Sequence, residues 1–180
     1  GLNKSENQDA EGSDRKELGL PYNQDKLISD LVKVNKNVVF VNISGNAVAM
    51  PWVKEVPGIV QGWFLGTEAG NALANVLVGD VNPSGKLSFT FPVKLADNGA
   101  HALGEFPGGD EVKYNESIFV GYRWADKQKA KPLFSFGHGL SYTTFAYGKV
   151  TADKKQMSSS DKITFSVNVK NKGPREGSEV

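Results

Sequence analysis

The sequence contains no cysteine among its 180 residues. Disulfide bonds, thiolate nucleophiles and zinc–thiolate sites are therefore excluded. Histidine is nearly as scarce, with only His101 and His138, which lie far apart in the sequence. A histidine-rich metal site is not expected, and we predict that no cofactor is used. Many secreted bacterial proteins carry no disulfide, and we expect a periplasmic or secreted protein.

The sequence also lacks any long block of charge of one sign. Its 21 basic and 20 acidic residues leave a net charge of +1, which argues against nucleic acid or an anionic membrane as a partner. No apolar run approaches the roughly 18 residues that a membrane-spanning helix needs, and no charged segment followed by an apolar one opens the chain. The chain opens directly on a polar loop and ends inside a strand-rich segment, so we expect a fragment of a longer protein.

The first half of the sequence predicts helices alternating with strands. Apolar residues at helical spacing predict a helix over residues 23–34, and runs of β-branched residues predict buried, parallel strands over 38–43 and 58–64. A second helix is expected with Thr67 as its N-cap and Gly79 at its end. This order predicts an α/β fold, a layered α/β sandwich with a largely parallel sheet covered by helices.

The second half changes to a pattern of strands. We predict strand-like segments over residues 87–91, 117–124, 149–151 and 163–169, and a long glycine- and charge-rich functional or connecting loop over 92–115.

The last strands predict the beginning of a β-sandwich. We place the α/β domain in residues 1–143 and the first strands of a truncated β-sandwich in residues 144–180. Two or three isolated strands cannot bury a face. Residues beyond about Thr151 are therefore expected to be disordered or to pair with the sheet of another copy.

Motifs along nearly the whole chain resemble those of glycoside hydrolase family 3. They are Glu11-Gly12-Ser13-Asp14-Arg15 with Leu20-Pro21, Gln61-Gly62-Trp63-Phe64-Leu65-Gly66, Gly79-Asp80-Val81-Asn82-Pro83-Ser84-Gly85-Lys86, and Phe134-Ser135-Phe136-Gly137-His138-Gly139-Leu140-Ser141-Tyr142. The end of the chain resembles the opening of the fibronectin type III-like domain that follows in many such enzymes. The resemblance thus implies the family's C-terminal α/β sandwich domain, truncated at its N-terminus, and the start of a second domain.

The resemblance also implies an activity. Family members are mostly retaining, exo-acting β-glucosidases, which hydrolyse terminal non-reducing β-D-glucosyl residues of β-linked oligosaccharides or glycosides. Their Asp nucleophile lies on an N-terminal TIM-like barrel that this sequence does not contain, and their α/β domain lends a Glu as general acid/base. Glu11 matches that Glu. The isolated chain is expected to be inactive, because retention needs both carboxyl groups.

Several alternatives stay open at this point. Glu6 is the rival for the acid/base role, and both glutamates have the plain interpretation of solvated loop carboxylates. We interpret Asp14 and Arg15 as structural support for the loop rather than as sugar ligands. One alternative is a β-xylosidase or a related family 3 glycosidase, such as an N-acetylglucosaminidase, although the Glu-bearing loop argues against the last. The other is a noncatalytic carbohydrate-binding or scaffolding module.

Overall fold

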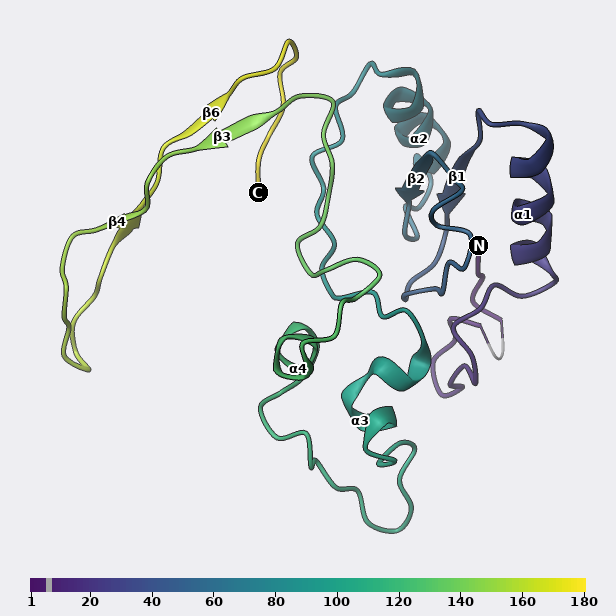
Figure 1. Cartoon of the computed structure of the whole chain (residues 1–180), viewed down its shortest axis with the longest axis horizontal. Helices are drawn as coiled ribbons and strands as arrows, with labels where there is room; N and C mark the ends of the chain where they lie inside the picture. Colours follow the sequence, from purple (N-terminus) through teal and green to yellow (C-terminus); the bar gives the residue numbers. More distant parts are fainter. Residues whose placement is uncertain (6–7) are drawn as a thin grey trace. The chain divides into compact units, whose positions relative to one another are not determined.

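The computed structural model describes residues 1–5 and 8–180 (Figure 1). It contains two compact units, one formed by residues 1–73 and 87–138 and the other by residues 74–86 and 139–180. The first unit holds the parallel strands and the second holds the antiparallel ones. Within the described part of the chain, no helix has both the length and the apolar character to cross a membrane.

Helix α1 spans Gln24–Val34, which confirms the first predicted helix to within one residue. Asn23 precedes it in the left-handed conformation, with φ 58°, and its backbone carbonyl accepts a hydrogen bond of 3.1 Å from the Leu27 amide. Ile28 and Val32 lie one turn apart and are buried, as expected for one apolar face of a helix. Helix α1 thereby contributes two side chains to the core of the first unit.

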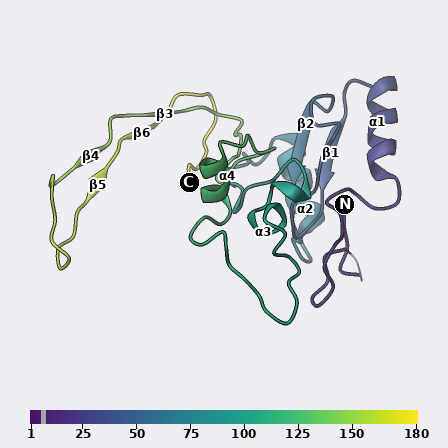
Figure 2. The same cartoon turned by 60° about the horizontal axis from the view of Figure 1, so that its bottom comes forward.

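Strands β1 (Val39–Asn42) and β2 (Gly58–Gln61) pair in parallel, as the sequence predicts. The register joins Val39 with Gly58 at one end and Asn42 with Gln61 at the other. Helix α1 lies beside this pair in both views (Figures 1 and 2). The strands are less buried than predicted, because the sheet has two strands among the described residues and Val39 is 54% exposed.

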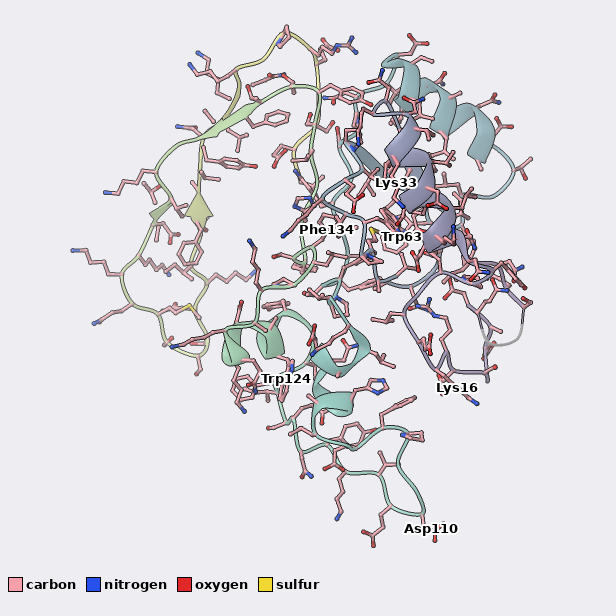
Figure 3. The ribbon with its side chains drawn as sticks, turned by 45° about the vertical axis from the view of Figure 1, so that its right-hand side comes forward. Lys16, Lys33, Trp63, Asp110, Trp124 and Phe134 are labelled. Atoms are coloured by element: carbon pink, nitrogen blue, oxygen red, sulfur yellow. The ribbon has the colours of Figure 1, made fainter. Side chains whose placement is uncertain are left out.

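Aromatic side chains fill the core of the first unit. Trp52 is 1% exposed, contacts the Phe40 ring edge-on at 4.6 Å, and donates from its indole N–H to Asp25 at 2.7 Å. Trp63 and Phe134, both labelled in Figure 3, are partly buried and pack against the same core. Trp52 is therefore a core residue of the first unit, and Trp63 packs against that core.

The predicted strand over residues 87–91 is an isolated bridge instead of a strand. Phe91 and Phe134 form an antiparallel bridge in which the Phe91 amide donates to the Phe134 carbonyl at 2.8 Å. The Leu87 amide donates to the His138 carbonyl, also at 2.8 Å. The backbone is thus paired at both ends of the segment without a continuous ladder between them.

The predicted strand over residues 117–124 is wrong, because this segment leads into helix α4 (Tyr122–Gln128). Gly121 precedes the helix with φ 60°, a value that breaks an extended run. The alternating residues Ile118 and Val120 are exposed, whereas Trp124 is buried from the helix. The period-two pattern therefore did not mark a buried strand face. Two short helical segments, η1 (Leu95–Asp97) and α3 (Gly99–Ala102), lie in the predicted long loop.

Helix α2 (Ala69–Val78) confirms the second predicted helix. It ends where predicted, at Gly79, which adopts φ 86°. None of its residues is buried, and Leu77 and Val78 are 46% and 70% exposed. Leu73 and Val76 are partly buried, so the apolar residues of α2 are only partly covered among the residues described.

The second unit contains an antiparallel ribbon. Strand β3 (Phe145–Tyr147) pairs with β6 (Val169–Asn171), and β4 (Thr151–Ala152) pairs with β5 (Phe165–Ser166). The strand predicted over 163–169 is thus divided in two, and the one predicted over 149–151 begins at its last residue. The expectation that residues beyond about Thr151 would be disordered or would pair with the sheet of another copy is wrong, because β5 and β6 pair with β4 and β3 of the same chain.

The ribbon nevertheless buries little surface. Every residue of β4, β5 and β6 is exposed, which agrees with the argument that so few strands cannot cover a face. The proposed domain boundary between residues 143 and 144 stays a prediction.

Candidate active site

The N-terminal loop lies at the carboxyl end of strand β1. The Leu2 amide donates a hydrogen bond of 2.7 Å to the carbonyl of Ile43, the residue that follows β1, and the Leu2 side chain is buried. Open α/β sheets bind their ligands outside the carboxyl ends of their strands. The polar loop that carries the predicted catalytic residue is therefore held at the end of the sheet where such sites form.

Glu11 lies at the centre of a tight turn within this loop. Ala10 and Ser13 form an antiparallel bridge around Glu11 and Gly12. Gly12 has φ 74°, the positive value that a type II turn requires at its third residue. Glu11 is exposed. The turn thus presents its carboxylate to solvent, where a substrate could reach it.

The residue that fixes the start of this turn is Asp9. Its carboxylate accepts hydrogen bonds from the Gly45 amide at 2.6 Å and from the Asn46 side-chain amide at 3.1 Å. The Asp9 amide donates to the Asn3 carbonyl at 3.0 Å. The side chain of Asp9 is only 3% exposed. Asp9 was not among the residues predicted from the sequence, and its one sequence signal is its position two residues before Glu11.

Arg15 fixes the other side of the turn. Its Nε atom lies 3.9 Å from Asp9 Oδ1, and its Nη2 donates to the Ala47 carbonyl at 2.5 Å. Burial lowers the pKa of the guanidinium, and the nearby Asp9 carboxylate partly offsets that effect. The interpretation of Arg15 as support for the loop is confirmed by these contacts.

A buried polar cluster stabilises the loop that receives Asp9. Asn42 Nδ2 donates to Ser44 Oγ at 2.8 Å and to Gln61 Oε1 at 2.7 Å, and Gln61 Nε2 donates to the Ser44 carbonyl at 3.1 Å. Asn42 and Ser44 are fully buried. These hydrogen bonds join the ends of β1 and β2 and fix the backbone just before Gly45.

The end of β2 completes the surroundings of the loop. Trp63 adopts φ 52°, an uncommon conformation for a bulky residue. The ring of Phe64 then lies so close to Gly45 that a Cβ atom on Gly45 would be 3.0 Å from Phe64 Cε2. Lys4 Nζ lies 5.3 Å from the centre of the Phe64 ring, a cation–π distance. A side chain at position 45 would therefore have to displace the Phe64 ring.

The other residues considered from sequence lie in varied settings. Glu6 falls outside the described residues. Asp14 is exposed in the same loop as Glu11. Trp124 is buried, and His138 stacks on Phe134 with ring centres 5.0 Å apart. Across residues 1–5 and 8–180, no group of three or more His, Asp and Glu side chains gathers as a metal site would.

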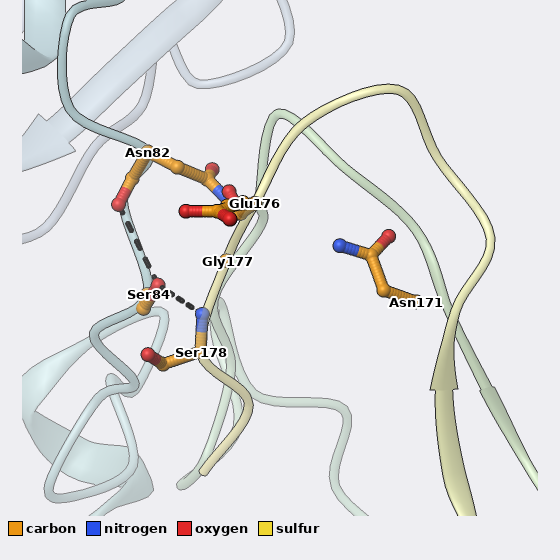
Figure 4. A pocket seen from close by; sticks show the side chains of 6 residues that line it. All are labelled: Asn82, Ser84, Asn171, Glu176, Gly177 and Ser178. Atoms are coloured by element: carbon orange, nitrogen blue, oxygen red, sulfur yellow. Dashed lines mark hydrogen bonds between the residues drawn. The ribbon is translucent and has the colours of Figure 1, made fainter.

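The second unit has an open pocket (Figure 4). It is lined by Asn82, Ser84, Asn171, Glu176, Gly177 and Ser178. Asn82 Nδ2 donates to the Glu176 carbonyl at 3.0 Å, and the Ser178 amide donates to Ser84 Oγ at 3.2 Å. These groups bond one another, so the pocket marks where the C-terminal segment attaches to the loop after α2.

The fold and the loop define an α/β domain that displays exposed carboxylates, Glu11 at the centre of the turn among them, beside the carboxyl ends of its parallel strands. The model of the glycosyl hydrolase family 3 C-terminal domain matches residues 2–142. The chain therefore belongs to glycoside hydrolase family 3, and its matched part is that family's C-terminal domain.

Relatives and solved structures agree with this membership. The β-glucosidase BoGH3A of Bacteroides ovatus is 54% identical over 184 residues, and the thermostable β-glucosidase B of Acetivibrio thermocellus is 46% identical over 173. These matches cover 100% and 96% of this chain but only 24% and 23% of those proteins. The chain thus spans about a quarter of the length of these relatives.

Among solved structures, DesR, a β-glucosidase from Streptomyces venezuelae determined in complex with D-glucose, superposes with a TM-score of 0.86 at 42% identity. The match covers 92% of this chain and 21% of DesR. The β-glucosidase of Kluyveromyces marxianus superposes with a TM-score of 0.82 at 44% identity, covering 92% of this chain and 19% of that protein. The α/β fold predicted from sequence is confirmed.

Proposed function

We propose that this chain supplies the general acid/base of a retaining, exo-acting β-glucosidase, with Glu11 in that role. The observation that carries the proposal is the position of Glu11, exposed on a turn that Asp9 and Arg15 hold beside the end of β1. The named β-glucosidases among the relatives support glucosides as the substrate class. An Asp nucleophile on an N-terminal barrel of the same polypeptide would complete the site.

The proposed reaction has two steps. In the first, the Asp carboxylate attacks the anomeric carbon while the glycosidic C–O bond breaks, and the Glu11 carboxyl gives its proton to the leaving oxygen. In the second, water attacks the same carbon, its proton passes to the Glu11 carboxylate, and the bond to Asp breaks. Retention requires the two carboxyl groups to lie about 5–5.5 Å apart. Such a distance depends on how the barrel meets this domain, so the chain alone should be inactive.

The C-terminal ribbon fits a second part of the proposal. We infer that strands β3 to β6 begin a fibronectin type III-like domain, which further strands would complete. The antiparallel pairing and the exposure of every residue in β4, β5 and β6 support this inference, because further strands would cover such a face.

The test uses the longer polypeptide in which this chain follows its barrel. Glu11→Gln should lower turnover of a β-linked disaccharide by about 10²–10⁴-fold, the usual contribution of a general acid. Turnover of an activated aryl β-glucoside should be restored by azide, because azide needs no general base, and β-glucosyl azide should form. Glu17→Gln, a change at an exposed residue of the same loop, serves as the matched control.

Glu6→Gln tests the rival in the same assay. Azide rescue in Glu6→Gln together with normal turnover in Glu11→Gln would transfer the role to Glu6. Normal turnover in both variants would contradict an acid/base role for this loop. Replacing the glucoside by the matching xyloside and N-acetylglucosaminide decides the sugar class.

A further inference from the structure

The loop that presents Glu11 contains a buried carboxylate two residues earlier. The Asp9 side chain is 3% exposed, whereas Glu11 is exposed. A carboxylate is rarely buried unless charged or polar partners compensate it. Asp9 has three such partners: the Gly45 amide, the Asn46 side chain and Arg15. A buried ion of this kind fixes its own position more strictly than an exposed one.

Two of the partners of Asp9 lie just beyond the end of the sheet. Gly45 and Asn46 lie three and four residues after the end of β1 at Asn42, and the hydrogen bonds among Asn42, Ser44 and Gln61 hold the backbone there. Asp9 therefore joins the N-terminal loop to the backbone that the hydrogen bonds among Asn42, Ser44 and Gln61 hold in place.

The turn that presents Glu11 is short. Its ends, Ala10 and Ser13, form an isolated bridge, and among the described residues no atom beyond the chain neighbours of Gly12 lies within 4 Å of a Cβ atom placed there. Consecutive Cα atoms are about 3.8 Å apart, and one residue separates Asp9 from Glu11, so a shift of Asp9 passes almost directly to Glu11. Since a misplacement of about 1 Å can cost 10²-fold in rate, the anchor matters for catalysis.

We propose that Asp9 is a positioning residue that sets the place of the Glu11 carboxyl through Gly45, Asn46 and Arg15. The proposal rests on the acid/base role of Glu11 proposed above. Asp9 takes no part in the proton transfer itself, because its carboxylate is occupied by these three partners.

The test separates positioning from general stability by the leaving group. A disaccharide needs protonation of its leaving oxygen, whereas a dinitrophenyl glucoside does not. In the longer polypeptide with its barrel, Asp9→Asn removes the charge and keeps the shape. We expect kcat/KM for the disaccharide to fall about 10-fold or more, while kcat/KM for the dinitrophenyl glucoside stays within about twofold. In the pH profile of the Asp9→Asn variant on the disaccharide, the limb that reports ionisation of the general acid should also become less distinct.

Asp30→Asn is the matched control. Asp30 also pairs with a cation, at 3.1 Å from Lys33, but its side chain is 47% exposed on helix α1. Both substrates should react as with the unchanged protein. An equal loss on both substrates in Asp9→Asn, or no loss on either, would overturn the proposal.

A second variant decides the matter if Asp9→Asn does not fold. Asn46→Ala removes one hydrogen bond from Asp9 and leaves its charge and Arg15 in place. A disaccharide-selective loss of about fivefold, the value of one hydrogen bond, supports positioning, and wild-type rates on both substrates refute it. Glu11→Gln is measured alongside. If it shows the acid/base signature while the Asp9 and Asn46 variants do not, the positioning role alone is wrong; if it does not, the proposed function is wrong.

Discussion

The two units differ in what determines their geometry. In the first, Trp52, Phe91, Val32 and Val48 are less than 2% exposed, and Asn42 is buried within a hydrogen-bonded cluster. In the second, the ribbon strands are held by backbone ladders and by hydrogen bonds at the surface. Burial excludes alternative arrangements, whereas an exposed two-stranded ribbon is marginal in water by itself. A substitution of a buried side chain in the first unit should therefore change stability more than a substitution of an exposed side chain in the ribbon.

The largest expected effect compares two phenylalanines. Phe91 is 1% exposed and stacks on Phe89, whereas Phe165 in β5 is 65% exposed. Phe91→Ala should lower the free energy of unfolding by about 3–5 kcal/mol because it leaves a cavity. Phe165→Ala should change it by no more than about 0.5 kcal/mol. Urea unfolding followed by tryptophan fluorescence measures both.

Tryptophan fluorescence reports selectively here, because all three tryptophans lie in the first unit. The ribbon is followed separately by amide hydrogen exchange. Equal effects of the two substitutions on the fluorescence midpoint would show that the ribbon and the core of the first unit unfold as one structure. The proposed difference between the two units would then be wrong.

A smaller effect is expected from the buried polar cluster. Asn42→Ala removes the donor to the partly buried Gln61 Oε1 and one of the donors to Ser44 Oγ, which keeps its hydrogen bonds with the Asn46 carbonyl and Gln61 Nε2. Such a loss costs about 1–3 kcal/mol. Asn168→Ala, at an exposed position of the ribbon, is the matched change and should cost less than about 0.5 kcal/mol. Thermal unfolding by circular dichroism distinguishes them, and a neutral Asn42→Ala would show that the cluster does not stabilise the end of the sheet.

The regular elements with clear local signals could be predicted from sequence. Helix α1 and the parallel pair β1 and β2 have strong periodic or β-branched patterns, and the structure confirms them. Residues 117–124 also alternate, but Gly121 has a positive φ and Trp124 is buried from a helix. The alternation of these residues does not reflect a buried strand face. A short stretch of sequence does not show which of its side chains will pack against residues that are distant in the sequence.

The site divides in the same way. The motif around Glu11 is contiguous, so the sequence alone could propose it. The importance of Asp9 could not be predicted, because its partners Gly45 and Asn46 are 36 and 37 residues away. Asp9 reaches these partners because strand β1 ends at Asn42 and because Leu2, near the start of the chain, is hydrogen-bonded to the residue that follows β1. Contacts of that separation appear once the tertiary fold is known.

The smallest expected effect concerns the C-terminal segment of the second unit. The Tyr147 hydroxyl donates to the Glu179 carboxylate, and Lys86 Nζ lies 3.3 Å from the same carboxylate. The Tyr147 hydrogen bond, with a further contribution from Lys86, lowers the pKa of Glu179 below its ordinary value. The same hydrogen bond raises the pKa of Tyr147.

These two shifts predict opposite pH limits. A lowered pKa of Glu179 in the folded state means that its stabilising contribution is present above the unfolded pKa, about 4.3, and is lost as the pH falls through the folded value. A raised pKa of Tyr147 means that its contribution is present below about 10 and is lost as the pH rises through the folded value. The segment should therefore be held best between about pH 5 and 10.

NMR titration of ring-labelled tyrosines measures this, with Tyr147→Phe to assign the signal. Glu179→Gln should bring the pKa of Tyr147 back toward its ordinary value, because the neutral amide no longer penalises ionisation of the phenol. Glu176→Gln, at an exposed position of the same segment, should leave the titration unchanged. If Glu179→Gln leaves it unchanged as well, the contact is too weak to hold the segment, and the ribbon depends on its backbone ladders alone.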